Sequence, residues 1–294
     1  MSLVEPEGIG AGTPAVGASA DSSQEGLRFL KAGDAGSHQM AAASGSSHWG
    51  GLLGPPLVVY AVVRLGELLV LALVPSPLSV AARVTAYDGR WYAAITSRGY
   101  PLQVPTGPDG VVTQNPIAFF PAYPLVVRAV AAAGVPIWLA ELLVTAVAGA
   151  AAVVLICLVA ARVGGATVGR RTTTAWVVAP PAFVIGLGYS EALFVAAAAG
   201  CLLGLLQQRW LTAGLAGCVA TATRPVGVAL VAAALAAAIP MLMQRRVRPL
   251  VAVLLVPAGG VAYLLWIGAR TGRADAWFVT EREGWGLIRI SGWR

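Results

Sequence analysis

The stretch IWLAELLVTAVAGAAAVVLICLVAA, residues 137–161, decides the fold class of this chain. It opens with Trp138, an aromatic residue of the kind that favours the interface between membrane and water. An α-helix needs about 20 consecutive apolar residues to cross the hydrocarbon core of a bilayer. Because residues 137–161 meet this length, we predict that they form a membrane-spanning helix.

The composition of the whole chain supports the same interpretation. Charged residues make up 11% of its 294 residues, against roughly 25% in a typical soluble domain. Hydrophobic residues make up 57%, and the mean hydropathy is +0.76. A soluble fold of this size needs far more charge to cover its surface. We therefore predict an all-α integral membrane protein, built as a multi-span helical bundle.

Further apolar runs predict the other membrane spans. They cover residues 52–74, 172–187, 191–206, 210–243 and 250–269. The run 210–243 is too long for one crossing, and Arg224-Pro225 divides it into two short spans or a re-entrant hairpin. Pro180-Pro181 is expected to kink the short run 172–187. The pattern predicts about seven spans within one polytopic membrane domain, residues 49–294.

Three segments lie outside the predicted spans. Residues 1–48 are rich in Gly, Ala and Ser, and such a segment buries too little apolar surface to offset its ordering entropy. We predict that this segment is a disordered tail. Residues 76–135 are expected to form a long polar loop after the first span, and residues 270–294 a charged, tryptophan-rich tail on the same side.

Arginines in the short loops predict the orientation of the spans. Three clusters fall on one side: Arg162, Arg170 and Arg171; Arg209; and Arg245, Arg246 and Arg248. Because short cytoplasmic loops carry an excess of arginine, we predict that this side and the tail 1–48 are cytoplasmic. The loop 76–135, Arg224 and the C-terminal tail then face outward from a plasma membrane. Arg83, Arg90, Arg98 and Arg128 lie in the outer loop against the rule, which makes them candidates for binding anionic ligands.

The net charge of +7 does not indicate a nucleic-acid partner. The arginines lie in short gaps between apolar runs, which is typical of topology signals and of contacts with lipid headgroups. Cys157, Cys201 and Cys218 all lie inside apolar runs. Their positions predict neither a disulfide framework nor a zinc site.

The outer loop contains the side chains best suited to chemistry. Asp88 lies among aromatic residues, close to the predicted membrane exit of the first span. A carboxylate held against apolar groups has a raised pKa and can act as a base. Neighbouring aromatic rings can stack on sugars, and arginines can hold phosphate oxygens bidentately. The alternative is an interfacial aromatic belt with a solvated Asp88, and the residues alone leave both interpretations open.

Two blocks of this sequence resemble the PIG-V family of mannosyltransferases. The first is YDGRWYAAITSRGYP, residues 87–101, followed by NPIAFFPAYP, residues 115–124. The family pattern there is Trp-Asp-x-x-Trp/Tyr-Tyr, then Gly-Tyr, then Ala-Phe-Phe-Pro-x-Tyr-Pro. The second block is GYSEALF, residues 188–194, with ATATRPVG, residues 220–227, which is similar to the family's Tyr-x-Glu-Ser-Leu-Phe and Ala-Thr-Arg segments. The blocks follow the family's order and spacing across residues 52–285, and the Ala-rich composition resembles actinobacterial homologues.

The resemblance implies a GT-C fold, a helical bundle whose active site faces outward on a long extracytoplasmic first loop. Family members transfer mannose from a polyprenyl-phosphate carrier to a hydroxyl group and invert the anomeric centre. The implied partners are the polyprenyl-phosphate-mannose donor, a lipid-linked or glycan acceptor, and membrane lipids. No cofactor and no required metal ion are expected, because no second acid stands beside Asp88 to form a DxD-type clamp.

The resemblance also implies roles for individual residues. The family's essential loop aspartate falls on Asp88, which is expected to be the catalytic general base. Glu191 matches the family's second acid and is expected to bind acceptor hydroxyls or to support Asp88. Its alternative role is a helix N-terminal acid with Ser190 as the cap. The other expected substrate contacts are Arg90, Arg98 and Arg224 for the phosphate, and Tyr92, Tyr100 and Tyr189 for the sugar.

Rival functions remain open at this point. Family members continue through further spans beyond the position of Arg294, so the resemblance implies a C-terminally short member with altered carrier-lipid binding. Tyr87 stands where the family has tryptophan, an exchange that should be tolerated. One rival is a transporter for a lipid-linked sugar, although only one broken segment, at Arg224-Pro225, fits the paired pattern of transporters. The other is an inactive family member that binds a partner.

Overall fold

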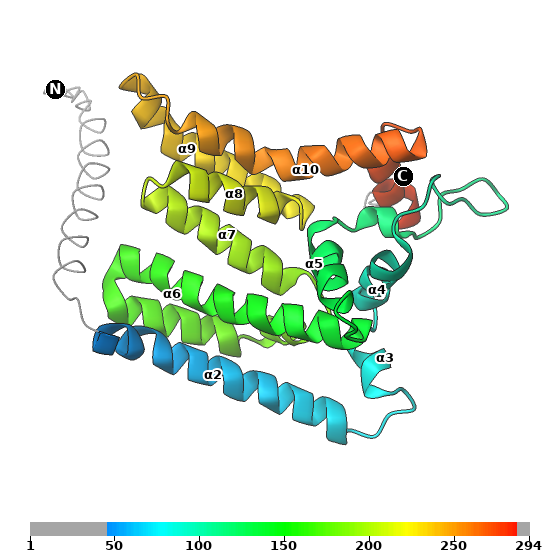
Figure 1. Cartoon of the computed structure of the whole chain (residues 1–294), viewed down its shortest axis with the longest axis horizontal. Helices are drawn as coiled ribbons and strands as arrows, with labels where there is room; N and C mark the ends of the chain where they lie inside the picture. Colours follow the sequence, from blue (N-terminus) through cyan, green and yellow to red (C-terminus); the bar gives the residue numbers. More distant parts are fainter. Residues whose placement is uncertain (1–45, 287–294) are drawn as a thin grey trace, which may run out of the picture. The chain divides into compact units, whose positions relative to one another are not determined.

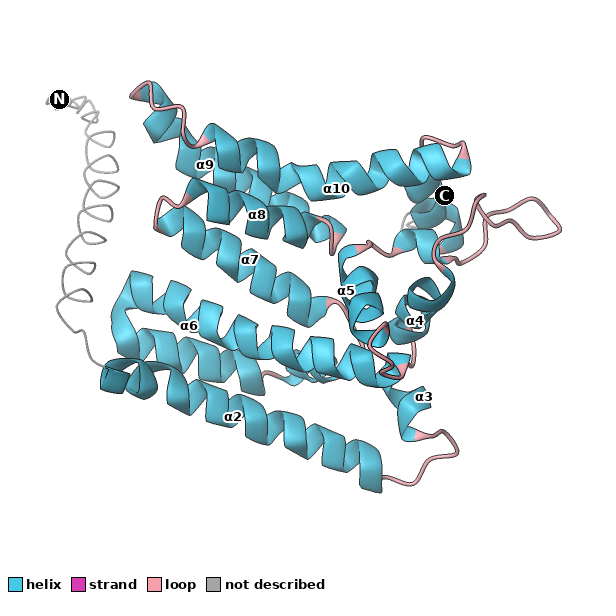
Figure 2. Cartoon of the chain, viewed as in Figure 1, coloured by secondary structure: helices cyan, strands magenta, loops and turns pink. Residues whose placement is uncertain are grey.

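The computed structural model describes residues 46–286, and these residues are an all-α membrane protein (Figure 1). Helices account for every regular element there except an isolated β-bridge between Thr106 and Val112 (Figure 2). The α-helices are α2 Ser46–Leu73, α3 Val80–Val84, α4 Asp88–Arg98, α5 Ala122–Ala131, α6 Ile137–Val178, α7 Glu191–Leu206, α8 Trp210–Thr221, α9 Ala229–Met243, α10 Leu250–Thr271 and α11 Ala276–Val279. The 3₁₀ helices are η1 Pro116–Ala118, η2 Pro180–Gly186 and η3 Pro225–Val228, and η4 Thr280–Gly284 is π-helical.

Both predicted tails fall partly outside the described residues. Residues 1–45 of the N-terminal tail and residues 287–294 of the C-terminal tail lie beyond them. The N-terminal boundary needs a correction, because α2 begins at Ser46, inside the segment 1–48 that was expected to be disordered. Polar Ser and His residues lower the hydropathy of this first turn without preventing it from joining the apolar helix that follows.

Four segments among residues 46–286 are long and apolar enough to cross a membrane. They are Gly50–Leu73, Ile137–Val178, Pro225–Met243 and Leu250–Thr271. Large apolar side chains point away from the protein, such as Leu65 (66% exposed), Val147 (71%) and Leu254 (70%). Apolar surface of this extent favours association in water and is stable against lipid tails. Helices α5, α7 and α8 are apolar but shorter than these four segments.

Helix α6 consists of two antiparallel arms that meet at Gly165. The backbone of Gly165 adopts φ 83° and ψ 173°, a conformation that glycine tolerates and residues with a Cβ rarely adopt. The chain then returns along the first arm (Figure 1). The arms are so close that a Cβ on Gly169 would lie 2.8 Å from the carbonyl oxygen of Cys157.

The two arms confirm separate helices for the predicted spans 137–161 and 172–187, but the second arm is shifted. It begins after Gly165 and ends at Val178, and η2 occupies the rest of the predicted span. Arginine is a good helix former, so the segment that contains Arg170 and Arg171 is helical although it is polar. The second arm ends where Pro180 removes a backbone donor, as the predicted kink required.

The run 210–243 is interrupted where the sequence predicted. Helix α8 ends at Thr221 and α9 begins at Ala229, with Arg224 and η3 between them. Helix α8 has 12 residues, which span about 18 Å at 1.5 Å per residue. This is less than the hydrocarbon core of about 30 Å. Small residues let α8 pack closely on its neighbours: a Cβ on Gly204 of α7 would lie 2.8 Å from the backbone nitrogen of Ala213.

The segment 76–135 is more ordered than the expected polar loop, since α3, α4, η1 and α5 lie within it. Averaged hydropathy misses α4 because this helix is amphipathic. Its buried face repeats at helical spacing with Tyr92, Ile95 and Thr96. Tyr92 joins a largely aromatic core that also contains Tyr100, Phe119, Phe120, Tyr123 and Tyr263. This core packs the segment 76–135 against α6 and α10.

The two ends of the helical bundle differ in charge. The end with the α6 turn, the α7–α8 turn and the α9–α10 turn carries the three arginine clusters that the sequence placed on one side. The opposite end carries α3, α4, α5 and α11 (Figure 1). The acids in the loops and at the helix starts gather there: Asp88, Asp109, Glu191, Asp275, Glu281 and Glu283. This second end therefore contains the groups suited to acid–base chemistry.

Candidate functional site

A strained turn places Asp88 at the first position of α4. Tyr87, immediately before it, has a positive φ of 51°, which is rare for a residue with a large side chain. The turn is held against the segment before α7: the Gly188 nitrogen donates to the Val84 carbonyl (3.2 Å), and the Tyr189 hydroxyl donates to the Ala86 carbonyl (3.2 Å). The first block of the sequence is thereby joined to the second block.

Ser190 lies at the centre of this junction. Its side chain is fully buried, and its hydroxyl lies 2.7 Å from the hydroxyl of Tyr92. Nη1 of Arg224 donates to the same Ser190 oxygen at 3.3 Å. Ser190 precedes α7, yet its side chain makes no capping hydrogen bond to that helix. Ser190 thus occupies the N-cap position, with Glu191 in the first turn of α7, but its hydroxyl bonds Tyr92 and Arg224 instead of capping the helix.

Arg224 lies in the break between α8 and η3. The extended backbone of Arg224 (φ −151°, ψ 144°) interrupts the helix, and its guanidinium pairs with the Glu191 carboxylate while also bonding Ser190. The Ala122 nitrogen donates to the Ala222 carbonyl at 2.9 Å, which ties this break to α5. We call Asp88, Tyr92, Ser190, Glu191 and Arg224 the acid–arginine cluster.

Burial and neighbouring charges act in opposite directions on the protonation of Asp88. Partial burial raises the pKa of Asp88, and the positive charges of Arg224 and then Arg90 oppose that rise. No ion pair among residues 46–286 includes Asp88, so its carboxylate is available to an incoming group. Burial also raises the pKa of Tyr92 far above its ordinary value, so Tyr92 remains a neutral hydroxyl. The cluster thus combines a proton acceptor with a guanidinium.

The remaining predicted residues divide between this cluster and other positions. Tyr189 joins the cluster through the Ala86 bond. Arg90 is exposed, and its guanidinium lies 5.2 Å from the centre of the Trp91 ring. Arg98 and Tyr100 lie at the far end of α4, whose 11 residues span about 16 Å. The structure therefore brings Tyr92, Tyr189, Glu191 and Arg224 to Asp88 but leaves Arg98 and Tyr100 apart.

The three predicted sugar-contacting tyrosines all use their hydroxyls within the protein. The Tyr100 hydroxyl donates to the Phe119 carbonyl at 2.6 Å, in addition to the bonds of Tyr92 and Tyr189. Their side chains are at most 9% exposed. Their contacts with a sugar stay a prediction, while their visible contribution is to hold the strained turn, α4 and α7 in place.

Glu141 is a residue near the cluster that our sequence analysis did not single out. It is fully buried in the first arm of α6, and neither of its carboxylate oxygens has a hydrogen-bond partner among the described residues. Its side chain lies against Gly188, where an added Cβ would be 2.6 Å from Oε2. A lone acid within an apolar run marks a candidate functional position, and this signal was available in the sequence.

The described residues do not bring three His, Cys, Asp or Glu side chains together in a group that could hold a metal ion. Comparisons of the chain with protein-family models, curated proteins and solved structures found no match.

Proposed function

We propose that this protein is a membrane glycosyltransferase. In this proposal it transfers mannose from a polyprenyl-phosphate carrier to a hydroxyl of a lipid-linked or glycan acceptor, with inversion. The observation that carries the proposal is the meeting of Asp88, Glu191 and Arg224, which come from three separate segments. These segments also contain the motifs that resemble the PIG-V family of the GT-C superfamily.

The proposed reaction is a single displacement at the anomeric carbon. The acceptor oxygen forms a bond to this carbon as its proton passes to the Asp88 carboxylate. The bond from the anomeric carbon to the phosphate oxygen breaks, and the polyprenyl phosphate leaves with the electron pair. A single displacement of this kind inverts the anomeric centre. A positioned base contributes about 10²–10⁴-fold to the rate.

Charge around the cluster suits this displacement. The raised pKa of Asp88 makes its carboxylate a better proton acceptor than a solvated aspartate. The guanidinium of Arg224 is only partly exposed (32% for its side chain), so it interacts more strongly with a leaving phosphate than a fully solvated one. Glu191 orients Arg224 and is available to acceptor hydroxyls. Arg90 adds a second positive charge near Asp88.

The location follows from the membrane helices. We propose a multi-pass protein of a plasma membrane, with α2, the two arms of α6, α7, α9 and α10 as its crossings and α8 as a short span that does not reach the full thickness of the hydrocarbon core. The cluster would face the outer side, because the arginine-rich short loops gather at the opposite end of the bundle. A lipid-linked donor in the same membrane would reach the cluster without leaving the bilayer.

Transport of a lipid-linked sugar is the second candidate function. Transporters place broken helices around a central site, and two interruptions adjoin the cluster here. One is η2 with the segment before α7, and the other is the break between α8 and α9. The sequence predicted a kink at Pro180-Pro181 for the first and a break at Arg224-Pro225 for the second, but only the second was counted as a broken segment. A transporter, unlike a transferase, would move its substrate without forming a new glycosidic bond.

Label transfer from the donor separates these functions. Membranes from cells that express the full chain would receive radiolabelled polyprenyl-phosphate-mannose, and label in lipid and protein fractions would be counted. We expect Asp88→Asn to reduce transfer by about 10²–10⁴-fold. The matched control is Asp109→Asn, because Asp109 is an exposed acid in the same outer segment, bonded only to the Val111 nitrogen.

Three results would argue against the proposal. Equal transfer by the native chain and Asp88→Asn would exclude Asp88 as the base. Movement of label across sealed vesicles without any new glycosidic bond would favour the transporter. Neither transfer nor movement, with an active control enzyme in the same membranes, would favour an inactive protein that binds a partner.

A further inference from the structure

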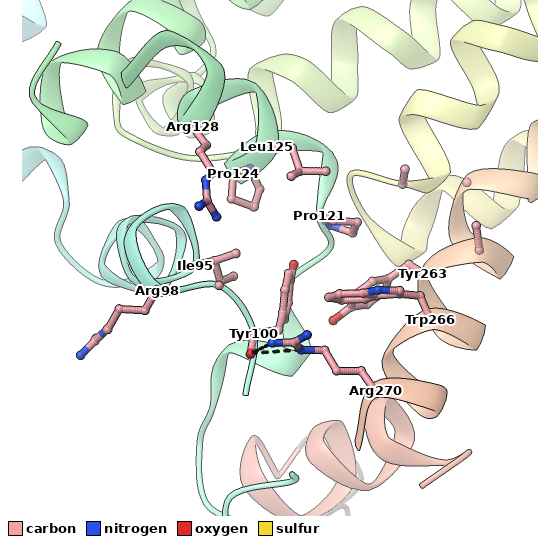
Figure 3. A pocket seen from close by; sticks show the side chains of 14 residues that line it. Ile95, Arg98, Tyr100, Pro121, Pro124, Leu125, Arg128, Tyr263, Trp266 and Arg270 are labelled. Atoms are coloured by element: carbon pink, nitrogen blue, oxygen red, sulfur yellow. Dashed lines mark hydrogen bonds between the residues drawn. The ribbon is translucent and has the colours of Figure 1, made fainter. Parts of the chain in front are cut away.

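A cavity of about 590 Å³ lies at the far end of α4 from Asp88. Helices α4 and α5 form one wall, and α10 forms the other (Figure 3). Apolar and aromatic side chains cover most of the surface, among them Ile95, Leu125 and Trp266. Its volume falls within the usual range for small-molecule sites, about 300–1,000 Å³. The cavity does not include any member of the acid–arginine cluster.

Three arginines line this apolar cavity: Arg98, Arg128 and Arg270. No acidic side chain of residues 46–286 lines it, so the cavity carries a local charge of three positive groups without a compensating negative one. Neither Arg98 nor Arg128 takes part in an ion pair within the described part of the chain. Uncompensated guanidinium groups beside apolar walls favour an anionic ligand.

The three arginines are held differently. Arg270 is fixed: its Nε and Nη2 donate to the Tyr100 carbonyl at 3.2 and 2.9 Å, and its guanidinium lies 5.4 Å from the centre of the Trp266 ring. Figure 3 shows the guanidinium of Arg128 turned toward the cavity, whereas the side chain of Arg98 extends away from the other labelled residues. A ligand headgroup would therefore meet Arg128 and Arg270 first, and Arg98 at the edge.

The position of the cavity indicates what kind of anion it takes. Arg270 lies in the last turn of α10, one of the segments long enough to cross a membrane, so the cavity opens at the depth of the lipid headgroups. Leu125 is 60% exposed and Trp266 is 45% exposed beside it, and together they offer an apolar surface on the membrane side. Tryptophan is typical of this interfacial depth. The site thus joins a phosphate-sized cluster of positive charge to a surface suited to an acyl chain.

We infer that this cavity binds an anionic glycerophospholipid of the surrounding bilayer. Its phosphate lies against Arg128 and Arg270, Arg98 adds positive charge at the edge, and one acyl chain lies along Leu125 and Trp266. The lipid joins α4 and α5 to α10 and so supports the segment that begins with Asp88. The inference does not depend on the proposed transferase activity, because lipid binding is measured without any donor or acceptor.

The test is native mass spectrometry of the full chain in detergent, with dioleoyl phosphatidylglycerol or dioleoyl phosphatidylcholine added. We expect preferential retention of phosphatidylglycerol by the native chain. In the double variant Arg98→Gln with Arg128→Gln, this retention should weaken about fivefold for each arginine removed. Arg270 is left intact because it also holds the Tyr100 carbonyl. The control is Arg83→Gln with Arg273→Gln, which removes two positive charges from the same end but outside the cavity.

Several outcomes would overturn the inference. Equal retention of phosphatidylcholine would show that the anionic headgroup is not recognised. An equal loss in the control double variant would indicate general charge attraction. Displacement of the lipid by millimolar glycerol phosphate would indicate a site for soluble phosphate. If the cavity variant does not fold, the melting temperature of the native chain is measured with each lipid. Phosphatidylglycerol should raise this temperature more than phosphatidylcholine does, and an equal rise would overturn the inference.

Discussion

Glu191 and Arg224 form an ion pair although 33 positions separate them in the sequence. Glu191 is the first residue of α7, and Arg224 lies in the break after α8. The same guanidinium nitrogen also bonds Ser190, which in turn contacts Tyr92 of α4. This pair therefore connects a helix start, a helix break and the helix that begins with Asp88. The predictions below test what this connection does.

Replacing Arg224 with lysine should distinguish the effect of the positive charge on transfer from the effect of the guanidinium geometry. Lysine keeps the positive charge, but its ammonium group ends a flexible chain and lacks the rigid guanidinium plane that sets the direction of Nη1 toward Glu191 and Ser190. We expect mannose transfer to fall at least about tenfold, with a loss of stability within about 1 kcal/mol because the pair is partly exposed. Transfer assays and thermal unfolding in detergent measure the two effects. Arg273→Lys, in an exposed pair with Asp275, is the control, and an equal loss of transfer there would contradict the role of Arg224.

Asp88→Asn should raise the melting temperature at neutral pH while it abolishes transfer. Partial burial raises the pKa of Asp88 in the folded state above its unfolded value. The folded state therefore disfavours the carboxylate form of Asp88. The contribution of Asp88 to the free energy of unfolding is fully present at low pH and is lost as the pH rises through the folded pKa. Asparagine removes the cost of burying that charge. We expect the variant to become more stable than the native chain as the pH rises above the unfolded pKa of Asp88, with the full difference above the folded pKa.

Thermal unfolding of both proteins across a pH series checks this prediction. The difference in melting temperature should shrink as the pH falls and vanish once Asp88 is protonated in both states of the native chain. A difference that does not change with pH would show that asparagine acts through packing. Transfer by the native chain should decline over the same acidic range, because the proposed base is active only as the carboxylate.

Gly259→Ala should destabilise the bundle, whereas Gly66→Ala should not. A Cβ on Gly259 of α10 would lie 2.0 Å from the carbonyl oxygen of Cys218 in α8, and backbone cannot give way there. Overpacking of this kind costs about 1–3 kcal/mol. Gly66 of α2 has no atom within 4 Å of such a Cβ, and alanine there should stabilise by up to about 1 kcal/mol. Equal melting temperatures for the two variants would contradict the close α8–α10 packing.

Glu141→Leu should stabilise the protein, in contrast to Glu67→Leu. The carboxylate of Glu141 is buried with no hydrogen-bond partner among residues 46–286, which costs about 1–3 kcal/mol. Leucine removes this cost at similar volume. Glu67 pairs with Arg64 at 2.8 Å, so its loss leaves a largely buried guanidinium unpaired and should destabilise. Thermal unfolding compares the two variants, and a lower melting temperature for Glu141→Leu would point to a partner of Glu141 in the membrane.

Hydropathy predicted the positions of most apolar helices because the lipid environment acts on each helix separately. A span must be apolar over its whole length and must satisfy its own backbone hydrogen bonds, so the requirement is local. The segment 137–161 and the break at Arg224-Pro225 are examples. Helix α4 was not predicted, because its stability depends on packing one face against α5, α6 and η1, and no average over its own residues contains that information.

The candidate site also had a part that the sequence predicted and a part that it did not. Asp88, Glu191 and Arg224 were recognised from short motifs, and Tyr92 and Tyr189 from their neighbours. Their arrangement was not predictable, because Arg98 lies only ten positions from Asp88 yet faces another cavity, whereas Arg224 comes from a distant segment. Glu141 stands out in the sequence as a lone acid within an apolar run, but its proximity to Gly188 arises only when α6 packs against the segment before α7.

The sequence by itself determined that this chain is a helical membrane protein, where most apolar helices run, and which acids and arginines stand out from apolar surroundings. Each of these properties depends on the transfer of nearby residues between water and lipid, so a short window of sequence is enough. The tertiary structure alone decided which of those charged groups meet. A turn at Tyr87, a break at Arg224 and the fold-back at Gly165 set the directions of helices, and those directions bring Glu191 and Arg224 to Asp88 while they leave three arginines around a separate cavity.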